Sequence, residues 1–507
     1  MRTINEYLSL EEFESVIFGN DKIDISKEVV DRVNASFDFL KDFSVNKVIY
    51  GVNTGFGPMA QYRIKDTDTI QLQYNLIRSH SSGTGKPLSP LCVKSAILAR
   101  LNTLSLGNSG VHPSVIQLMK ELINRDITPL IFEHGGVGAS GDLVQLAHLA
   151  LVLIGEGEVF YKGERKSTKE VFALENLAPI NVEIREGLAL MNGTSVMTGI
   201  GVVNIHYAKK LIDWSIQCSC AINEIVSAYD DHFSAELNGT KRHKGQQEIA
   251  QRMRTHLADS QLIRKREEHL YTGENTEDIF KEKVQEYYSL RCVPQILGPI
   301  LETTVNAANI LEDEFNSAND NPIIDVANKH VYHGGNFHGD YIALEMDKLK
   351  IAITKLTMLA ERQLNYLLNS KINEMLPPFV NLGTLGFNFG MQGVQFTATS
   401  TTAENQMLSN PMYIHSIPNN NDNQDIVSMG TNAAVITGKV IENAFEVLSI
   451  EMITIVQAID ALNQKDSISS ASRKLYDELR NIIPTFKEDQ AMYPFVQKVK
   501  DFLMNSK

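Results

Sequence analysis

Cysteine is scarce in this chain, which has four in 507 residues. Cys218 and Cys220 form a single C-x-C pair, with no second pair to complete a zinc site, and so few cysteines give no disulfide framework. His330, His333 and His338 lie close together in the sequence, but they lack the helical H-E-x-x-H spacing of a zinc enzyme. We therefore expect neither disulfides nor a bound metal.

Long apolar runs and an excess of positive charge are missing as well. No uninterrupted apolar run of about 18 residues occurs, and the N-terminal MRTINEYLSLEEFESVIFG lacks the basic and apolar regions of a signal peptide. The net charge of −14 would repel the phosphate backbone of nucleic acid. A basic stretch between residues 238 and 271 is interrupted by acidic residues, which is typical of a solvated face or of part of an active-site lid. We expect a cytoplasmic protein that binds neither membranes nor nucleic acid.

Proline is absent from three long windows, residues 180–293, 323–376 and 419–483. Because an interior proline breaks a helix, these windows predict long helices. Apolar residues recur at steps of three and four between residues 349 and 367, and residues 433–462 are apolar on more than one face. These patterns are typical of core helices in a bundle.

The first third of the chain has shorter elements and many glycine-rich turns. The convincing strands lie between residues 157 and 185, in EVFYKGERKST and the following INVEIREG, with a Lys-Gly turn. We expect a mainly α protein, with an α-rich N-terminal domain over residues 1–200 and a helical bundle over residues 201–507.

The stretch GGVGASGD, residues 135–142, places four glycines around Ser140. It lacks the lysine of a phosphate-binding P-loop, and a glycine directly after the serine does not fit the G-x-S-x-G nucleophile elbow. An ordinary alternative is a glycine-rich loop that ends with Asp142 as the N-cap of a helix.

A chemical alternative concerns the tripeptide Ala139-Ser140-Gly141. In a backbone conformation that glycine permits, the Gly141 nitrogen can attack the carbonyl carbon of Ala139. Ring closure with loss of water, and a second dehydration at Ser140, would give 4-methylideneimidazol-5-one (MIO), an electrophile made from the chain itself.

Seven segments in this order make the chain similar to the aromatic amino acid ammonia-lyases and aminomutases, which carry MIO. They are VIYGVNTGFGP, LQYNLIRSHSSGTGKPLS, GGVGASGDLVQLAHLALVLIGEG, REGLALMNGTSVMTG, YSLRCVPQILGP, GGNFHGD and NQDIVSMGT. The resemblance covers nearly the whole chain, is strongest to bacterial tyrosine ammonia-lyases, and implies a mainly α, fumarase/aspartase-like fold. It also implies MIO formed from residues 139–141 with no external cofactor, and a homotetramer whose active sites are each lined by three subunits.

The resemblance also assigns roles to residues. It makes Tyr50 the base that takes the β-proton, Ser140 the source of the carbon that captures the substrate amine, and Arg291 the ligand of the substrate carboxylate. Attack by the aromatic ring on the same carbon is the alternative to capture of the amine. The resemblance adds Tyr288 to the catalytic set. It places around the substrate Gly57, Asn192, Gln285, Phe337 and Asn423.

Two markers of the substrate disagree. Ser79-His80 is the pair typical of histidine lyases, whereas Gln424 stands where those enzymes have glutamate and where tyrosine and phenylalanine lyases have glutamine. A neutral amide cannot replace a carboxylate beside an imidazole, while His80 can bind a phenol hydroxyl. We therefore expect conversion of L-tyrosine to p-coumarate. Histidine ammonia-lyase is the main alternative, and phenylalanine ammonia-lyase, tyrosine 2,3-aminomutase and a non-catalytic homologue are lesser ones.

Overall fold

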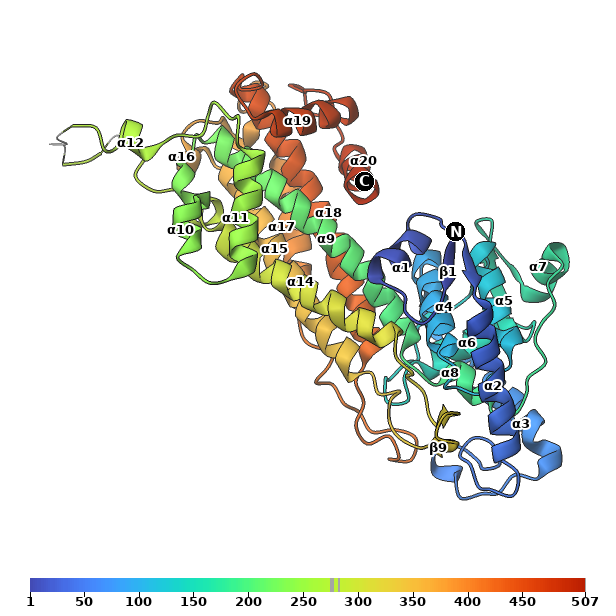
Figure 1. Ribbon diagram of the computed structural model, residues 1–507. Coiled ribbons are helices and arrows are strands. Elements are labelled where there is room, and N and C mark those ends of the chain that lie inside the picture. Colours follow the sequence, from blue (N-terminus) through green and yellow to red (C-terminus); the bar gives the residue numbers. More distant parts are fainter. Residues whose placement is uncertain (274–277, 281–282, 507) are drawn as a thin grey trace. The chain divides into compact units, whose positions relative to one another are not determined.

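Helices predominate and strands are short in the computed structural model (Figure 1). The structure describes residues 1–273, 278–280 and 283–506. The chain forms two compact units: unit 1 is Met1–His206, Ala307–Asp347 and Pro411–Gly438, and unit 2 is Tyr207–Asn306, Lys348–Asn410 and Lys439–Lys507. The mainly α fold class is confirmed. Unit 1 includes two segments that follow residue 200, and the continuous domain division at that residue stays a prediction.

The interior of unit 1 contains helix α4, in which every residue from Val93 to Ser105 is buried. Helices α1, α2 and α5 pack against it. Its start is specified locally, because the Ser89 hydroxyl accepts a hydrogen bond from the Cys92 N–H and Pro90 occupies the first helical position. The helices confined to unit 1 are α1 (Leu10–Ile17), α2 (Lys27–Phe43), α3 (Thr69–His80), α4 (Pro90–Ser105), α5 (Pro113–Asn124), α6 (Leu143–Leu153), α7 (Thr168–Glu175) and α8 (Glu186–Met191).

The predicted hairpin in EVFYKGERKST is confirmed as β6 (Glu158–Tyr161) and β7 (Glu164–Ser167). Lys162 and Gly163 both have positive φ, as a tight two-residue turn requires. The prediction of a strand in INVEIREG, residues 180–187, is wrong, because the segment joins no strand and its last two residues begin α8. The other pairs are β1 (Arg2–Ile4) with β2 (Ile23–Ile25), which is parallel, β3 (Thr84–Pro87) with β5 (Phe132–His134), β4 (Thr128–Pro129) with β6, and β8 (Ile323–Asp325) with β9 (His330–Tyr332).

Unit 2 is built from helices, and its C-terminal helix is held by polar contacts as well as by apolar packing. The Trp214 indole N–H donates to the Leu503 carbonyl at 3.0 Å, and the Lys210 ammonium donates to the carbonyls of Met504 and Ser506. A cation at these last carbonyls stabilises the helix end. The helices confined to unit 2 are α10 (Ala235–Gly239), α11 (Lys244–His256), α12 (Arg266–His269), α13 (Tyr288–Arg291), α16 (Ser370–Asn373), α17 (Gln392–Leu408), α19 (Ser470–Ile482) and α20 (Tyr493–Asn505).

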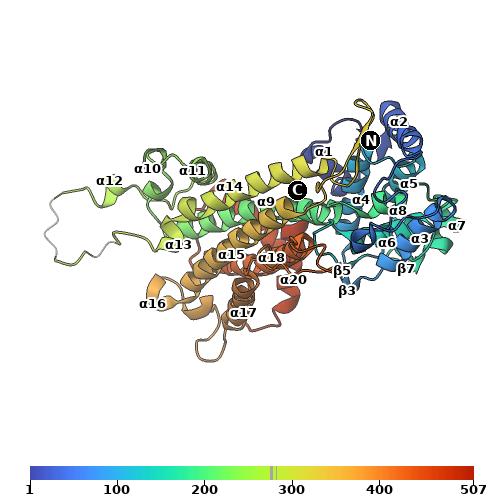
Figure 2. The same cartoon turned by 90° about the horizontal axis from the view of Figure 1, so that it is seen from below.

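Four long helices contribute residues to both units, and their unit 2 portions run alongside one another in both views (Figures 1 and 2). They are α9 (Ser195–Ile225), α14 (Val293–Phe315), α15 (Asp340–Leu368) and α18 (Gly430–Ala461). Both helical patterns predicted from the sequence are confirmed, in α15 and α18; Leu349, Ile353 and Leu356, for example, are fully buried. Among the residues that the structure describes, no helix is long and apolar enough to cross a membrane.

Candidate active site

The glycine-rich segment, residues 135–142, connects β5 to α6 in unit 1 and is held by distant parts of the chain. The carbonyl of Gly138 accepts hydrogen bonds from the Gly339 N–H and the Ser428 hydroxyl, both at 3.1 Å. Ala139 is buried. Because segments near residues 339 and 428 both bind this loop, its conformation depends on tertiary contacts and not on its own sequence alone.

Gly141 is held against the backbone of Gly193. Its φ is +72°, and a Cβ atom at this position would lie 2.0 Å from the Gly193 carbonyl oxygen. The same oxygen accepts the Asp142 N–H at 2.7 Å. Both the backbone conformation and the close approach therefore require glycine at position 141.

Asp142 stands at the N-cap position of α6, but its side chain makes no hydrogen bond to that helix. Its carboxylate instead accepts the N–H groups of Val196 and Met197 at 2.8 and 2.9 Å, in the first turn of α9, together with the Thr431 hydroxyl. Burial raises the pKa of Asp142 to about 6, although these donors act in the opposite direction. Asp142 therefore occupies the predicted N-cap position, but its side chain does not cap α6. The carboxylate instead connects the start of α6 to α9 and α18.

Ser140 receives two amide donors. Asn192 Nδ2 donates to its carbonyl oxygen at 2.9 Å, and Gln424 Nε2 donates to its hydroxyl oxygen at 2.8 Å. Ser140 itself is half-buried. Asn192 and Gln424, both predicted site residues, therefore bind the predicted Ser140 directly.

Gln424 is presented by a tight loop in which Asn420, Asn421 and Asp422 all have left-handed backbone conformations. Asn and Asp tolerate this conformation better than other non-glycine residues, which explains the composition of the segment. Asn419 and Gln424 close the loop with mutual backbone hydrogen bonds of 3.2 and 3.3 Å. The predicted Asn423 belongs to the same loop and is exposed.

Tyr50 and Gly57 lie beside this loop. The Gly57 N–H donates to the Tyr50 hydroxyl oxygen at 3.0 Å. A Cβ atom on Gly57 would lie 2.7 Å from Asn420 Nδ2, so the two loops touch. The contacts run from Tyr50 through Gly57 and the Gln424 loop to Ser140, and they bring these predicted residues into one site.

His80 ends helix α3, and its ring is oriented by that helix. His80 Nδ1 lies 3.0 Å from the Leu76 carbonyl oxygen, and the Ser79 hydroxyl donates to the same oxygen at 3.1 Å. The Ser79 hydroxyl also lies 3.0 Å from His80 Nδ1. In the tautomer in which Nδ1 donates to the Leu76 carbonyl, Nε2 of the neutral ring is an acceptor. Strand β3, which follows His80, pairs with β5, and β5 leads directly into the glycine-rich loop.

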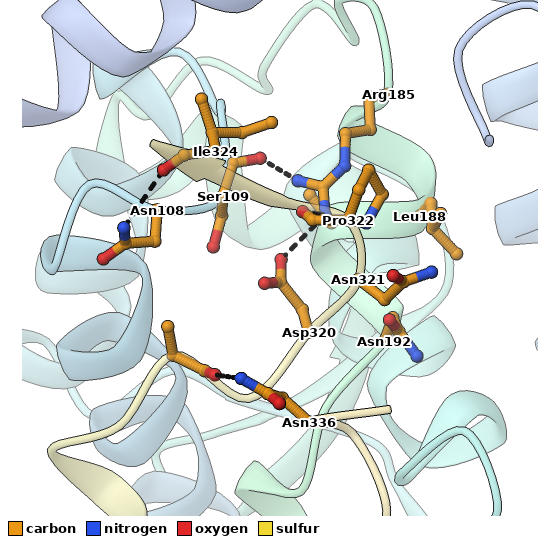
Figure 3. Close-up of polar contacts among 12 residues, drawn as sticks. Asn108, Ser109, Arg185, Leu188, Asn192, Asp320, Asn321, Pro322, Ile324 and Asn336 are labelled. Carbon is orange, nitrogen blue, oxygen red and sulfur yellow. Dashed lines mark hydrogen bonds and ion pairs between the residues drawn. The ribbon is translucent and has the colours of Figure 1, made fainter. Parts of the chain in front are cut away.

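Phe337 lies in a connection that is anchored on both sides. Asn336 Nδ2 donates to the Ala318 carbonyl at 3.1 Å (Figure 3), and the ring of His338 bonds to the Ile426 carbonyl at 3.2 Å. Gly339 then meets the glycine-rich loop as described above. Phe337 is half-buried between these anchors.

The three neighbouring histidines do not converge on one point. His330 packs on Tyr332 with ring centroids 4.5 Å apart, whereas His338 Nδ1 lies 2.6 Å from the Asp340 carboxylate. In the described ranges, no group of three or more His, Cys, Asp or Glu residues is arranged to hold a metal ion.

Three predicted residues belong to unit 2. Arg291 and Gln285 line a cavity of about 560 Å³, and the Arg291 guanidinium lies 4.6 Å from the centre of the Tyr288 ring. Arg291 Nε is buried and has no hydrogen-bond partner among the described residues, so it has a donor to offer an anion. Tyr288 is 70% exposed. Burial lowers the pKa of His232, in the same cavity, to about 4, so this histidine adds no positive charge at neutral pH.

Comparison with known proteins decides the family. The profile of the aromatic amino acid lyase family matches residues 8–481. The chain belongs to this family. A histidine ammonia-lyase from Geobacillus sp. (strain WCH70) is 37% identical over 497 residues, which cover 98% of this chain and 95% of that protein. An MIO-dependent tyrosine 2,3-aminomutase from Streptomyces globisporus is 36% identical over 506 residues, with 98% and 94% covered.

A solved structure of an aromatic amino acid lyase family member agrees with this assignment. The tyrosine aminomutase from Streptomyces globisporus matches this chain with a TM-score of 0.95 and 34% sequence identity, covering 99% of this chain and 96% of that one. The family resemblance, the mainly α fold and the prediction that this chain is a carbon–nitrogen lyase are confirmed.

Sequence reasoning about this lyase missed two buried residues beneath Ser140. The sequence predicts Asp142 only as a helix cap and gives no role to Arg100, whose side chain binds the carbonyl of Asn192 at 2.8 Å. The available signal was Arg100 itself, the one charged residue in the segment SAILARLNTL, residues 95–104. A buried charge without an adjacent acid in sequence indicates a specific structural task.

Proposed function

We propose that this enzyme is a tyrosine ammonia-lyase that converts L-tyrosine to p-coumarate and ammonia, with MIO formed from Ala139, Ser140 and Gly141. The observation that carries the choice of tyrosine is the orientation of His80. Its Nδ1 faces the Leu76 carbonyl, and in the tautomer that donates to this carbonyl Nε2 can accept the proton of a phenol hydroxyl.

The residues around the tripeptide fit the formation of MIO. Ala139 is small and buried, and Gly141 has the positive φ and the close neighbour that exclude a side chain. Asn192 donates to the Ser140 carbonyl oxygen, and Gln424 donates to the hydroxyl that must leave. When formed, the group supplies an electrophile that makes the substrate amine a better leaving group.

Side chains of the enzyme supply the proton transfer and the binding of the substrate. Tyr50 takes the β-proton, and the Gly57 N–H on its oxygen stabilises negative charge there. Arg291 binds the substrate carboxylate, for which its unpaired Nε is available. Tyr288 and Gln285 accompany it, and Phe337 packs beside the electrophile.

Gln424 lies beside Ser140, and this position weakens its use as a marker of the substrate ring. Its amide contacts the Ser140 hydroxyl, so it acts on the electrophile end of the site. Discrimination among aromatic rings therefore rests on His80 and its neighbour Ser79. Histidine is the second candidate substrate, because the Ser79-His80 pair is the one typical of histidine lyases and a close relative is named a histidine ammonia-lyase.

The proposal is tested by giving the purified enzyme tyrosine, histidine or phenylalanine separately. The formation of p-coumarate, urocanate or cinnamate is followed by absorbance, and β-tyrosine is measured by chromatography. We expect the highest kcat/KM for tyrosine with p-coumarate as the main early product. A higher kcat/KM for histidine, or β-tyrosine as the main early product, would replace the proposed activity.

Replacing His80 with phenylalanine is expected to shift the preference from tyrosine to phenylalanine. Removal of the acceptor leaves the phenol hydroxyl unpaired, and the ratio of the two kcat/KM values should change by about 10- to 100-fold. Ser81→Ala is the matched control, because the Ser81 hydroxyl donates to the Ile77 carbonyl at the same end of α3 and Ser81 has no assigned role in recognition of the substrate. An equal change of the ratio in both variants would remove His80 from recognition of the phenol.

The proposed enzyme is a homotetramer in which Arg291 serves the Ser140 of another subunit. Two inactive variants, Ser140→Ala and Arg291→Met, should then complement each other, because mixed tetramers contain some sites with both native residues. We expect activity to appear when the two proteins are dissociated, mixed and reassembled, and not when either is treated alone. Inactive mixed tetramers would place Arg291 and Ser140 of one site in the same subunit.

A further inference from the structure

Arg100 is buried beneath the glycine-rich loop in an unusual setting. The residue is 1% exposed, and its direct partners are neutral: Nη2 donates to the carbonyls of Ala189 and Asn192, and Nη1 donates to Asn319 Oδ1 at 3.2 Å. Burial lowers the pKa of Arg100 to about 10, with Asp320 and Asp142 opposing the shift. A cation held mainly by main-chain carbonyls fixes the backbone that carries those carbonyls.

The backbone that Arg100 holds is the one that contacts the tripeptide. A Cβ atom on Gly193 would lie 2.4 Å from Arg100 Nη1, so the guanidinium lies directly behind Gly193. On the other side, the Gly193 carbonyl touches Gly141, and the Asn192 side chain binds the Ser140 carbonyl. Asn192 and Gly193 thus form a clamp, with Arg100 behind it and the tripeptide in front.

We propose that Arg100 is the positioning residue for MIO formation, acting through the clamp of Asn192 and Gly193. This inference rests on the proposed function, because it needs the tripeptide to cyclise. Arg100 touches none of the reacting atoms. Its role is to keep Gly193 against Gly141, so that the Gly141 nitrogen stays directed at the carbonyl carbon of Ala139.

The reaction that Arg100 supports needs no co-reactant. The Gly141 nitrogen bonds to the Ala139 carbonyl carbon, and its proton passes to the carbonyl oxygen. That oxygen leaves as water with the Ser140 amide proton. A second water takes the α-proton and the hydroxyl of Ser140. The product has lost two water molecules in total, so its formation is read directly from the intact mass of the protein.

Arg185 provides a matched control in the same region. It is fully buried, and it binds the carbonyls of Ser109 and Pro322 and the Asp320 carboxylate (Figure 3). These partners lie outside the clamp. Lysine at either position keeps the positive charge but cannot reproduce the planar fork of donors. Arg100→Lys and Arg185→Lys therefore each remove the planar set of guanidinium donors and keep the charge. Only Arg100→Lys removes donors that bind the clamp.

The experiment compares the native enzyme, Arg100→Lys, Arg100→Met, Arg185→Lys and Ser140→Ala. Each protein is purified by gel filtration, its fold is checked by circular dichroism, and the folded fraction is incubated while intact mass and near-ultraviolet absorbance are followed. We expect both Arg100 variants to lose water at least about tenfold more slowly than the native enzyme. Arg185→Lys should lose water at the native rate even where its melting temperature falls.

The outcomes separate this inference from the proposed function. If the native protein keeps both water molecules, the MIO-dependent function itself is wrong. Ser140→Ala is the reference that cannot lose the second water, because it has no hydroxyl to eliminate. If the native protein is dehydrated and the folded Arg100 variants are dehydrated equally fast, Arg100 has only a structural role. Should Arg100→Met not fold, Arg100→Lys decides the question, because it keeps the buried charge near Asp320. Equal slowing in Arg100→Lys and Arg185→Lys would likewise contradict the inference.

Discussion

Replacing Ser140 with alanine is expected to lower kcat for ammonia release by at least about 10³-fold, because alanine cannot supply the methylidene carbon. The variant should also lack the near-ultraviolet absorbance of MIO and should show no loss of the second water, because alanine has no hydroxyl to eliminate. Compared with the uncyclised chain, the variant should lose little stability, since the hydroxyl makes one hydrogen bond, to Gln424, worth about 1 kcal/mol.

Ser428→Ala is the control for this change. Ser428 also loses a hydroxyl beside the glycine-rich loop, where it bonds to the Gly138 carbonyl, but it takes no part in ring formation. The control should keep the absorbance, the dehydrated mass and most of the activity. Native activity in Ser140→Ala, or absorbance that survives the substitution, would support a non-catalytic role for the tripeptide.

The sequence was informative about elements whose signals are local. In α15 apolar residues recur every three or four positions, and in α18 apolar residues lie on more than one face. Both patterns are those of packed helices, and both helices lie where the patterns predict them. The turn at Lys162-Gly163 could be predicted for the same reason. Both residues have positive φ, as the tight two-residue turn of a β-hairpin requires. INVEIREG misled because its alternation resembles a strand, whereas Arg185, with φ of +65°, ends the extended run.

The same distinction between local and distant signals applies to the residues of the site. Ser140, Asn192 and Gln424 could be predicted because their neighbouring residues form recognisable segments, and the structure brings all three together. The tasks of Arg100 and Asp142 could not be predicted, because their partners are main-chain groups contributed by other segments. Nearly every residue has a main-chain N–H and carbonyl, so the sequence does not show which of these groups a side chain binds. Such contacts can be identified only in the folded chain.

Asp142 provides the second large prediction, and its two obvious substitutions should behave differently. In Asp142→Ala the N–H groups of Val196 and Met197 lose their acceptor in a buried site, which costs about 1–3 kcal/mol for each group. One asparagine oxygen can accept both N–H groups, as one Asp142 oxygen does in the native protein. We therefore expect Asp142→Asn to fold normally and Asp142→Ala to be strongly destabilised.

The pH dependence gives the sharper test, because the sign is fixed by the direction of the shift. The pKa of Asp142 is raised to about 6 in the folded protein, so between pH of about 4 and 6 the folded state binds more protons than the unfolded state. The contribution of Asp142 to the native free energy of unfolding therefore falls as the pH rises through this window. Asparagine does not titrate, so Asp142→Asn should match the native protein near pH 4 and exceed it by up to about 3 kcal/mol above pH 6.

The difference between these two proteins isolates Asp142, because all other titrating groups are common to both. Denaturant unfolding at one fixed protein concentration and several pH values measures it, since fixed concentration keeps any contribution from subunit association comparable. A difference that does not vary with pH would mean that folding leaves the pKa of Asp142 unshifted. The donors would then fully offset the effect of burial on the carboxylate, which would present a full negative charge to the Arg100 side of the site near neutral pH.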